Sequence, residues 1–376
     1  MNLIALCPFG IEKLLRDEIK HLGYTVTNSA AGKVFFDGPW EAVYKANLHL
    51  RTAERILVQI GRFPAGDFDQ LFEGLSALPW EDWLSPHTTI VVEKVKTFKS
   101  KLTSVPTVQG MVQKAVFQRL ADRWGLRTLP QVGPQTGLRV YLECDEALAA
   151  VDTTGPALHN RGYRKQAGEA PLKENLAAAL LLFSGWRRKY PLYDPLCGSG
   201  TILAEALQFA YDMPPGLGRA FSFEHLVPHQ ALDWKILRDE GRSRIDFSHR
   251  VRICGSDKDG RVLEMARSNL RNLGHEEAIQ LEHLSMEEAR AETVRGAQPG
   301  ERGFLICNPP YGERLETRAH AENLSRQMRH FAADFPGWKI GVLTSLEGFA
   351  QQIDRQPYVV RDLVNGSIPV KYYQFE

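Results

Sequence analysis

Cysteines are few in this chain, and none is arranged for a disulfide framework or a metal site. Cys7, Cys144, Cys197, Cys254 and Cys307 make an odd number without a C-x-x-C pair, and most fall in apolar, strand-like runs. The eleven histidines show no ligand spacing either. These absences favour reduced, structural thiols and no metal, as in cytoplasmic proteins.

Long apolar runs and a strong net charge are also missing. No stretch approaches the roughly 20 apolar residues that a membrane-spanning helix needs, and residues 1–8 are too short for a signal peptide. The formal net charge is +1, so the chain as a whole does not attract nucleic acid. With 376 residues, 43% of them hydrophobic, it can form two or three domains with ordinary cores. We expect a cytoplasmic, metal-free protein that does not enter membranes, and the oligomeric state stays open.

A glycine-rich turn follows a short apolar segment near the middle of the chain. Residues 190–194 predict a buried strand, and an apolar helix begins at Thr201. Glycines let the backbone approach a ligand closely, and the helix start offers free N–H groups. A dehydrogenase would carry a third glycine where this chain has Leu203, and an acid about 20 residues later. The turn therefore favours a nucleotide-like cofactor other than a nicotinamide. Its candidate cofactor residues are Asp194, Pro195, Cys197, Gly198, Ser199 and Gly200.

An acid ends the next predicted strand. Residues 251–257 are mostly apolar and finish at Asp257, and a helix is predicted from 260 to 273. A carboxylate at a strand tip can accept hydrogen bonds from both ribose hydroxyls of a nucleoside. Asp259 suits the cap of the following helix better than Asp257 does. Asp257 is therefore the candidate ribose ligand, with Lys258 beside it.

Residues 308–311 read Asn-Pro-Pro-Tyr after a short apolar strand at 303–307. Pro309 and Pro310 stop the strand abruptly, so carbonyls at its end can point into a cleft. An aryl amine is a poor nucleophile because its lone pair is delocalised into the ring. The side-chain oxygen of Asn308 and the carbonyl of Pro309 can accept the two amine hydrogens, which turns the lone pair towards a methyl donor. Tyr311 can stack on the base.

The glycine turn and the Asn-Pro-Pro-Tyr motif together predict a methyltransferase. The expected cofactor is S-adenosylmethionine, and the expected acceptor is an exocyclic amine of a nucleic-acid base. The candidate catalytic residues are Asn308, Pro309, Pro310 and Tyr311, and Asn308 is also expected to border the cofactor.

The order of these motifs resembles that of bacterial THUMP-domain RNA methyltransferases, of the RlmL type and its YpsC-like relatives with one methyltransferase domain. The resemblance covers essentially the whole chain, through residues 159–164, 170–177, 194–201, 215–223, 255–257, 308–312 and 365–375. It implies an α/β fold: a Rossmann-like sheet of seven strands with a closing antiparallel hairpin. In front of this sheet it implies an α+β region, ferredoxin-like and then THUMP, that binds RNA.

The resemblance also implies the reaction, which is transfer of a methyl group to the N2 amine of a guanine in large-subunit (23S) ribosomal RNA. One feature departs from the family. Many relatives carry an acid after the third strand, near the adenine of the cofactor, whereas this chain has Ser285 there. The expected contact then falls to Ser285 or to the backbone of Met286.

Periodic patterns divide the chain into three expected domains, at 1–64 (ferredoxin-like), 65–155 (THUMP) and 156–376 (methyltransferase). The first alternates strands and helices within about 60 residues. The second has helical patterns at 67–78 and 106–124 and strands at 88–96 and 138–144. The third alternates helices with strands near 191, 252, 279, 305, 341, 359 and 370, the pattern of a doubly wound sheet that binds its cofactor at the strands' carboxyl ends.

Basic residues are grouped locally despite the small net charge, and such groups can neutralise phosphates. The groups at 187–189 are better explained as a helix end. Two groups are the candidate RNA-binding residues: Lys94, Lys96, Lys99 and Lys101, and then Arg161, Arg164 and Lys165.

The target base stays open on the motif alone, because an adenine N6 amine suits the same Asn-Pro-Pro-Tyr geometry. The alternatives are an N6-adenine methyltransferase on DNA or RNA, a transfer-RNA N2-guanine methyltransferase, and a non-catalytic RNA-binding or assembly factor. A DNA enzyme is disfavoured because the extra residues precede the methyltransferase region, where RNA binding is expected. An intact Asn308–Tyr311 motif with Asp257 argues against the non-catalytic alternative.

Overall fold

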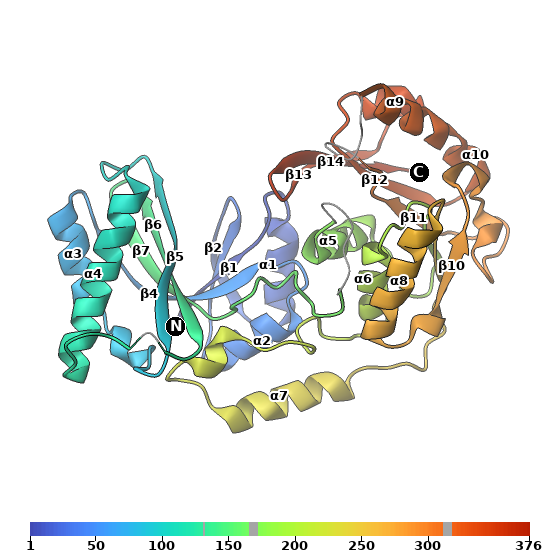
Figure 1. Ribbon diagram of the computed structural model, residues 1–376. Coiled ribbons are helices and arrows are strands. Elements are labelled where there is room, and N and C mark those ends of the chain that lie inside the picture. Colours follow the sequence, from blue (N-terminus) through green and yellow to red (C-terminus); the bar gives the residue numbers. More distant parts are fainter. Residues whose placement is uncertain (131, 165–171, 311–317) are drawn as a thin grey trace. The chain divides into compact units, whose positions relative to one another are not determined.

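The computed structural model describes residues 1–130, 132–164, 172–310 and 318–376 (Figure 1). Tyr311 and Lys165, both predicted site residues, therefore lie outside the described residues. The chain forms two compact units. The first contains Met1–Leu6, Arg16–Leu158 and Arg219–Asp239, and the second contains Cys7–Leu15, His159–Gly218 and Glu240–Glu376.

Strands and helices alternate along most of the chain. The strands are β1 (Asn2–Leu6), β2 (Thr25–Ala30), β3 (Lys33–Asp37), β4 (Arg55–Pro64), β5 (Thr89–Phe98), β6 (Gln135–Glu143), β7 (Glu146–Asp152), β8 (Leu192–Asp194), β9 (Ile253–Asp257), β10 (Ile279–His283), β11 (Phe304–Cys307), β12 (Lys339–Thr344), β13 (Val359–Asn365) and β14 (Ile368–Phe375). The α-helices are α1 (Glu12–His21), α2 (Glu41–His49), α3 (Phe68–Ala77), α4 (Val105–Trp124), α5 (Glu174–Ser184), α6 (Thr201–Ala210), α7 (Ala231–Ser243), α8 (Gly260–Leu273), α9 (Arg318–Gln327), α10 (Phe331–Asp334) and α11 (Phe349–Ile353).

The first unit is built on a seven-stranded sheet in the order β2-β3-β1-β4-β7-β6-β5. Its pairings are antiparallel except that between β5 and β6. The strands on both sides of the predicted boundary at residue 64 join this one sheet, because β4 pairs with β7. Helices α3 and α4 lie side by side, and α4 packs on β5 (Figure 1).

Strand β7 was not predicted from the sequence. Its residues, Glu-Ala-Leu-Ala-Ala-Val-Asp, are rich in alanine, which has a low intrinsic preference for strands. The segment is a strand because β4 and β6 flank it and complete its backbone hydrogen bonds. Tertiary pairing therefore overrides local propensity at this position.

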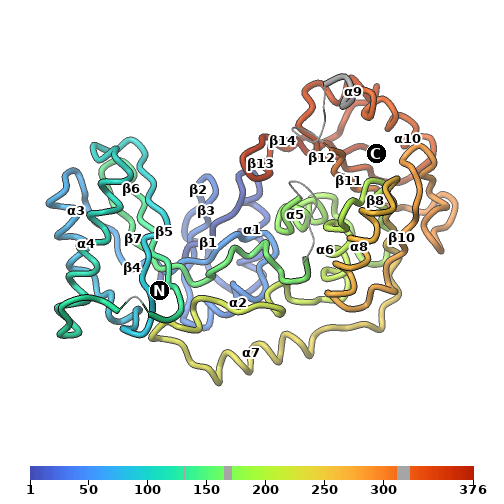
Figure 2. Tube along the Cα trace, viewed as in Figure 1, coloured from blue at the N-terminus to red at the C-terminus, as the bar shows by residue number. Residues whose placement is uncertain are grey.

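The second unit is built on a sheet in the order β10-β9-β8-β11-β12-β14-β13. Neighbouring strands are parallel from β10 to β12, and β14 is antiparallel to both β12 and β13. All seven strands expected from the sequence are present, including the closing hairpin. The trace in Figure 2 follows them from green through yellow to red, in the second half of the chain. The predicted Rossmann-like methyltransferase sheet is confirmed.

Helical layers cover both faces of this second sheet. On one face, α5 packs on α6 and α6 packs on α8. On the other face, Tyr193 and Leu305 from the strands form a core cluster with Phe331, Phe335 and Phe349 from the helical segments. Strand β8 lies between β9 and β11. The next two strands in the sequence, β9 and β10, lie on one side of β8, and the later strands lie on the other side, so the strand order reverses at β8. Sheets of this type bind their ligands at such a point, beyond the strands' carboxyl ends.

Candidate active site

The glycine turn directly follows β8 and is anchored to β9. The amide of Cys197 donates to the carbonyl of Ser256 at 2.9 Å, and the amide of Gly200 donates to the carbonyl of Cys197 at 2.8 Å. Gly198 and Gly200 have φ values of +54° and +81°, in the left-handed region that favours glycine. Helix α6 begins immediately afterwards, so its first N–H groups face the same end of the sheet.

Asp257 ends β9 and contacts the turn directly. Its Oδ2 accepts a hydrogen bond from the amide of Gly198 at 3.1 Å, and its Oδ1 accepts one from the amide of Asp259 at 3.0 Å. Asp259 caps α8, because its side chain accepts from the amide of Arg261 at 2.9 Å. The predicted cap role of Asp259 is therefore observed, and the ribose role of Asp257 stays a prediction. Lys258 is exposed, and its carbonyl lies 2.9 Å from His283 Nε2.

Asp194 and Cys197 are both buried within this turn. Asp194 is 2% exposed and accepts a hydrogen bond from the amide of Leu196 at 3.1 Å. Burial raises the pKa of its carboxyl well above the usual value, although the amide of Leu196 opposes this effect, and Asp257 raises it further. Burial likewise raises the pKa of the Cys197 thiol well above its usual value. Cys197 is thus a packed thiol and not an activated nucleophile.

Asn308 follows β11, whose four residues are all buried. Its Oδ1 is also buried and, among the described residues, has no hydrogen-bond partner. A buried acceptor without a donor costs about 1–3 kcal/mol, and native proteins leave few of them. Pro309 is buried and Pro310 is half-buried. The site thus presents an unused acceptor at the position where the sequence predicts a ligand amine.

Three adjacent strand ends bring these groups to one edge of the sheet. Strand β8 pairs with β9 so that Asp194 lies opposite Gly255, two residues before Asp257. On its other side β8 pairs in parallel with β11, which ends one residue before Asn308. Neighbouring strands lie about 4.8 Å apart. The glycine turn, Asp257 and Asn308 therefore line one strip at the carboxyl ends of the strands.

Ser285 and Met286 follow β10, the next strand along the same edge. The hydroxyl of Ser285 donates to Glu288 Oε2 at 2.8 Å, and its amide donates to the same oxygen at 3.1 Å. The bond from the amide belongs to a capping box on the short helix Met286–Glu288. The side chain of Met286 lies in the core cluster, and its carbonyl is 3.1 Å from His330 Nε2. A cofactor contact at this position stays a prediction.

Arg161 and Arg164 require a correction to their predicted role. Arg161 is 4% exposed, and its Nε lies 3.5 Å from Glu205 Oε1 of α6. The Nε of Arg164 lies 3.2 Å from Glu174 Oε1, and its Nη2 donates to Thr201 Oγ1 at 2.6 Å. Both guanidinium groups pair with buried glutamates inside the unit. The structure therefore contradicts the prediction that Arg161 binds phosphate, and it does not support the same prediction for Arg164.

The ion pairs formed by these two arginines support the cofactor turn instead. Arg164 ties the start of α5, at Glu174, to Thr201, the residue that follows the turn. Burial raises the pKa of Glu174 to about 7, and Arg164 opposes that rise. The sequence held a signal for this network, because glutamates within apolar helices are rarely buried without a partner. Asn269 of α8 adds a further support, donating to the carbonyl of Ser199 at 3.2 Å.

The four predicted RNA-binding lysines near β5 are all exposed. Lys94 and Lys96 belong to β5, the edge strand of the first sheet, and Lys99 and Lys101 lie in the turn that follows it. Lys101 Nζ lies 3.7 Å from Asp145 Oδ2. Their exposure is compatible with phosphate binding.

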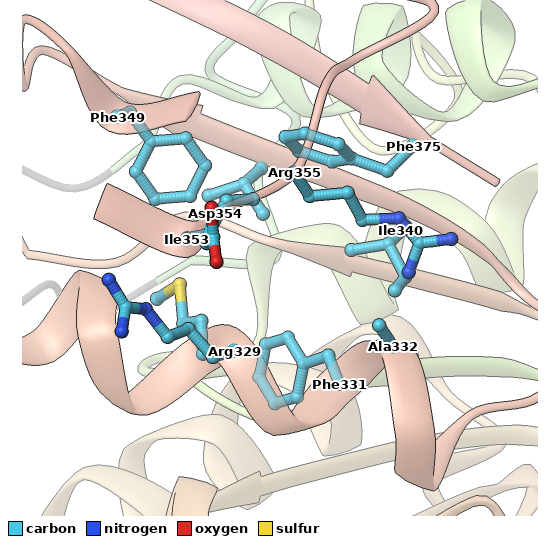
Figure 3. A pocket seen from close by; sticks show the side chains of 11 residues that line it. Arg329, Phe331, Ala332, Ile340, Phe349, Ile353, Asp354, Arg355 and Phe375 are labelled. Atoms are coloured by element: carbon cyan, nitrogen blue, oxygen red, sulfur yellow. The ribbon is translucent and has the colours of Figure 1, made fainter. Parts of the chain in front are cut away.

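A separate hollow of about 230 Å³ lies beside β12 and β14 (Figure 3). Phe331 and Phe349 border it, and Arg329 and Arg355 lie along its rim. None of the predicted catalytic or cofactor residues lines it. Within the described ranges, no helix is long and apolar enough to cross a membrane. The same residues contain no group of three or more His, Cys, Asp or Glu side chains that could hold a metal ion.

The strand order, the glycine turn after β8 and the acid at the tip of β9 define a Rossmann-like methyltransferase. Comparison with known families agrees: residues 161–374 match the RMKL-like methyltransferase domain. Residues 2–57 match the RlmL ferredoxin-like domain, and residues 65–152 match the THUMP domain. The chain belongs to the RMKL-like methyltransferase family, in the arrangement that carries ferredoxin-like and THUMP domains before the catalytic one.

Individual relatives support the same assignment over the whole chain. YpsC of Bacillus subtilis (strain 168), named as a candidate RNA methyltransferase, is 35% identical over 100% of this chain and 95% of its own length. A ribosomal RNA large subunit methyltransferase K/L of Syntrophotalea carbinolica is 33% identical over 100% of this chain and 53% of its own. The chain thus spans about half the length of the K/L relatives. The crystal structure of SMU.472, a candidate methyltransferase complexed with S-adenosylhomocysteine (SAH), superposes with a TM-score of 0.91 at 37% identity, covering 100% of this chain and 97% of that one.

Proposed function

We propose that the protein methylates the N2 amine of a guanine in large-subunit ribosomal RNA. The observation that carries the proposal is the buried Oδ1 of Asn308, which has no hydrogen-bond partner within residues 1–130, 132–164, 172–310 and 318–376. It lies on the strip of strand ends that also holds the glycine turn and Asp257. An acceptor at this position suits a ligand with N–H donors, which an exocyclic amine provides.

The cofactor of the protein is S-adenosylmethionine, whose electrophilic methyl group is the one transferred. In this chain Gly198 and Gly200 allow close approach of the backbone to the ligand. The carboxylate of Asp257 would accept hydrogen bonds from the ribose hydroxyls. It would then exchange or share the bonds that it now receives from the amides of Gly198 and Asp259.

Asn308 and Pro309 carry the proposed amine chemistry. The side-chain oxygen of Asn308 accepts one amine hydrogen, and the carbonyl of Pro309 accepts the other. Holding both hydrogens fixes the direction of the nitrogen lone pair. The rate of transfer then depends on this orientation of the amine, and no strong general base is needed. The proton is lost to solvent after transfer. Tyr311, outside the described residues, is proposed to stack on the base.

The RNA part of the proposal is supported by the THUMP match and by the names of relatives. The K/L relatives are named as ribosomal RNA large subunit methyltransferases, and YpsC as a candidate RNA methyltransferase. The exposed lysines of the region after residue 65 are the proposed phosphate contacts: Lys94, Lys96, Lys99 and Lys101. The N2 amine is chosen over adenine N6 because of the family resemblance, since both amines suit the same acceptors.

The direct test uses ribosomal RNA from cells that lack the protein. The purified protein is incubated with that RNA and labelled S-adenosylmethionine, and the methylated nucleoside is identified by mass spectrometry. We expect N2-methylguanosine in the large-subunit RNA. N6-methyladenosine would keep the amine mechanism and overturn the base. Cofactor binding without any product on this RNA would contradict the proposed substrate.

A first variant addresses the cofactor part of the proposal. Asp257→Asn should weaken S-adenosylmethionine binding at least tenfold, because hydrogen bonds to a charged acceptor contribute about 1.5–3 kcal/mol. Each carboxylate oxygen of Asp257 accepts from a backbone amide, of Gly198 or of Asp259. The NH2 group of asparagine cannot accept, so one of these two hydrogen bonds is lost. Isothermal titration calorimetry measures the affinity. Asp259→Asn is the matched control, because asparagine still caps a helix and the affinity should hold. Equal affinity of wild type and Asp257→Asn would refute the ribose role.

A further inference from the structure

An exposed aromatic ring stands at the end of the edge strand of the first sheet. Phe98, the last residue of β5, is 57% exposed. Its neighbour Val95 points into the core, whereas Lys94, Lys96 and Phe98 share the outward side of the strand. An exposed phenylalanine costs free energy of hydration, and large exposed apolar groups often mark contacts with a partner.

The turn after Phe98 is anchored by hydrogen bonds to neighbouring residues. Asp145 Oδ1 accepts hydrogen bonds from the amide of Lys101 at 2.7 Å and from Ser100 Oγ at 3.1 Å. The carbonyl of Phe98 accepts from the amide of Cys144 at 3.1 Å. Lys99 has a φ of +48°, a left-handed conformation that side chains rarely adopt without such support. The position of the Phe98 backbone at the end of the edge strand is thus well defined.

One lysine lies against the ring, and two more precede it on the same side of the strand. Lys99 Nζ lies 5.3 Å from the centroid of the Phe98 ring. In the part of the chain that the structure describes, no carboxylate lies within ion-pair distance of Lys94, Lys96 or Lys99. Positive charge beside an exposed aromatic face is the combination that binds unpaired nucleotides, because the phosphates contact cations while the base stacks on the ring.

The same side of the sheet extends this cationic surface beyond β5. Lys33 Nζ of β3 lies 4.0 Å from the centroid of the Tyr141 ring, and Tyr141 pairs with Lys96 across β5 and β6. The apolar cluster beneath consists of strand residues alone: Ile4, Leu57, Tyr141, Leu148 and Ala150, with Leu6 and Phe35 packed against it. Lys33 therefore borders this cluster at Tyr141.

We infer that Phe98 is a stacking platform for an unpaired base of the RNA substrate, with Lys94, Lys96 and Lys99 neutralising the adjoining phosphates. The inference rests on the proposed function and deepens it, since it names the element of RNA that the first unit recognises. If this surface instead bound a partner protein, Phe98 would not distinguish single-stranded from double-stranded RNA.

The test compares Phe98→Ala with Phe98→Trp, and with Phe9→Ala as a matched control. Phe9 is 53% exposed, so the control removes an equally exposed ring elsewhere. The probes are a single-stranded segment of in vitro transcribed large-subunit ribosomal RNA and the same segment fully paired with its complement. Filter binding measures the dissociation constants, and thermal unfolding checks that each variant is folded.

Phe98→Ala should weaken binding of the single strand about tenfold, within the range measured for removal of one base-stacking ring. Binding of the duplex should change little, and Phe98→Trp should restore the single-strand affinity. A triple Lys94→Gln, Lys96→Gln, Lys99→Gln variant should lower the slope of log affinity against log salt by about 2, at about 0.7 for each lost phosphate contact. The triple Lys13→Gln, Lys20→Gln, Lys114→Gln variant carries the same charge change on exposed helix positions and serves as its control.

Two results would overturn the inference: wild-type affinity in Phe98→Ala, or equal losses on single-stranded and double-stranded RNA. Methylation of full-length large-subunit RNA by the wild-type protein is measured in parallel. If the wild type forms N2-methylguanosine while Phe98→Ala binds normally, the stacking role fails and the proposed function stands. If the wild type forms no product on that RNA, the proposed function fails instead.

Discussion

Replacing Asn308 by alanine should lower the rate of methyl transfer by a factor of about 10²–10³, the usual cost of one pre-organised polar group at a reacting centre. The affinity for S-adenosylmethionine should stay nearly unchanged. The reason lies in the environment of the amide oxygen, which is buried and, in the described part of the chain, has no partner within the protein. Its removal therefore breaks no internal hydrogen bond and deprives the substrate amine of one acceptor.

Single-turnover kinetics with labelled cofactor measure the rate, and calorimetry measures the affinity. Asn323→Ala is the matched control, because Asn323 is an exposed amide on α9 of the same unit. Asn308→Asp separates the two parts of the role, since it keeps an oxygen acceptor but adds charge. Full activity of Asn308→Ala would refute the proposed orientation of the amine. An equal loss of cofactor affinity would make Asn308 a cofactor ligand and not an orienting group.

The sequence predicted the second sheet well because its signals are local. Each strand is a short apolar run that ends at a turn residue or a polar side chain, as at Asp194, Asp257 and Asn308. Parallel strands with helical connections have few possible orders, so the positions of the strand ends nearly fix the location of the site. The cap role of Asp259 was likewise predictable from its position before α8.

Other features depend on contacts between distant residues, which the sequence pattern does not contain. Arg161 and Arg164 read as a basic surface group, yet their partners Glu205 and Glu174 lie further along the chain on α6 and α5. Burial decides these cases, and burial follows from packing, not from local charge.

The second large effect concerns stability. Glu205→Ala should lower the free energy of unfolding by about 3–5 kcal/mol, the typical cost of removing one partner from a buried ion pair. The side chains of Arg161 and Glu205 are 1% and 0% exposed. Glu205 Oε1 also accepts from Tyr163 OH at 3.3 Å and from Gln208 Nε2 at 3.2 Å, so the variant also removes the acceptor of these two donors. Urea unfolding followed by circular dichroism measures the change.

Two comparisons separate the buried charge from other causes of instability. Asp239→Ala breaks the exposed pair with Lys235, whose side chains are 47% and 73% exposed, and should change stability by about 0–1 kcal/mol. The double variant Arg161→Met, Glu205→Leu should recover most of the loss, because apolar replacements of both partners leave no charge stranded in the interior. A double variant as unstable as Glu205→Ala would attribute the loss to the hydrogen bonds of Tyr163 and Gln208. Helix α6 begins at the cofactor turn, so the double variant should also regain cofactor affinity. That result would show that the pair of Arg161 and Glu205 supports the site through the stability of the unit.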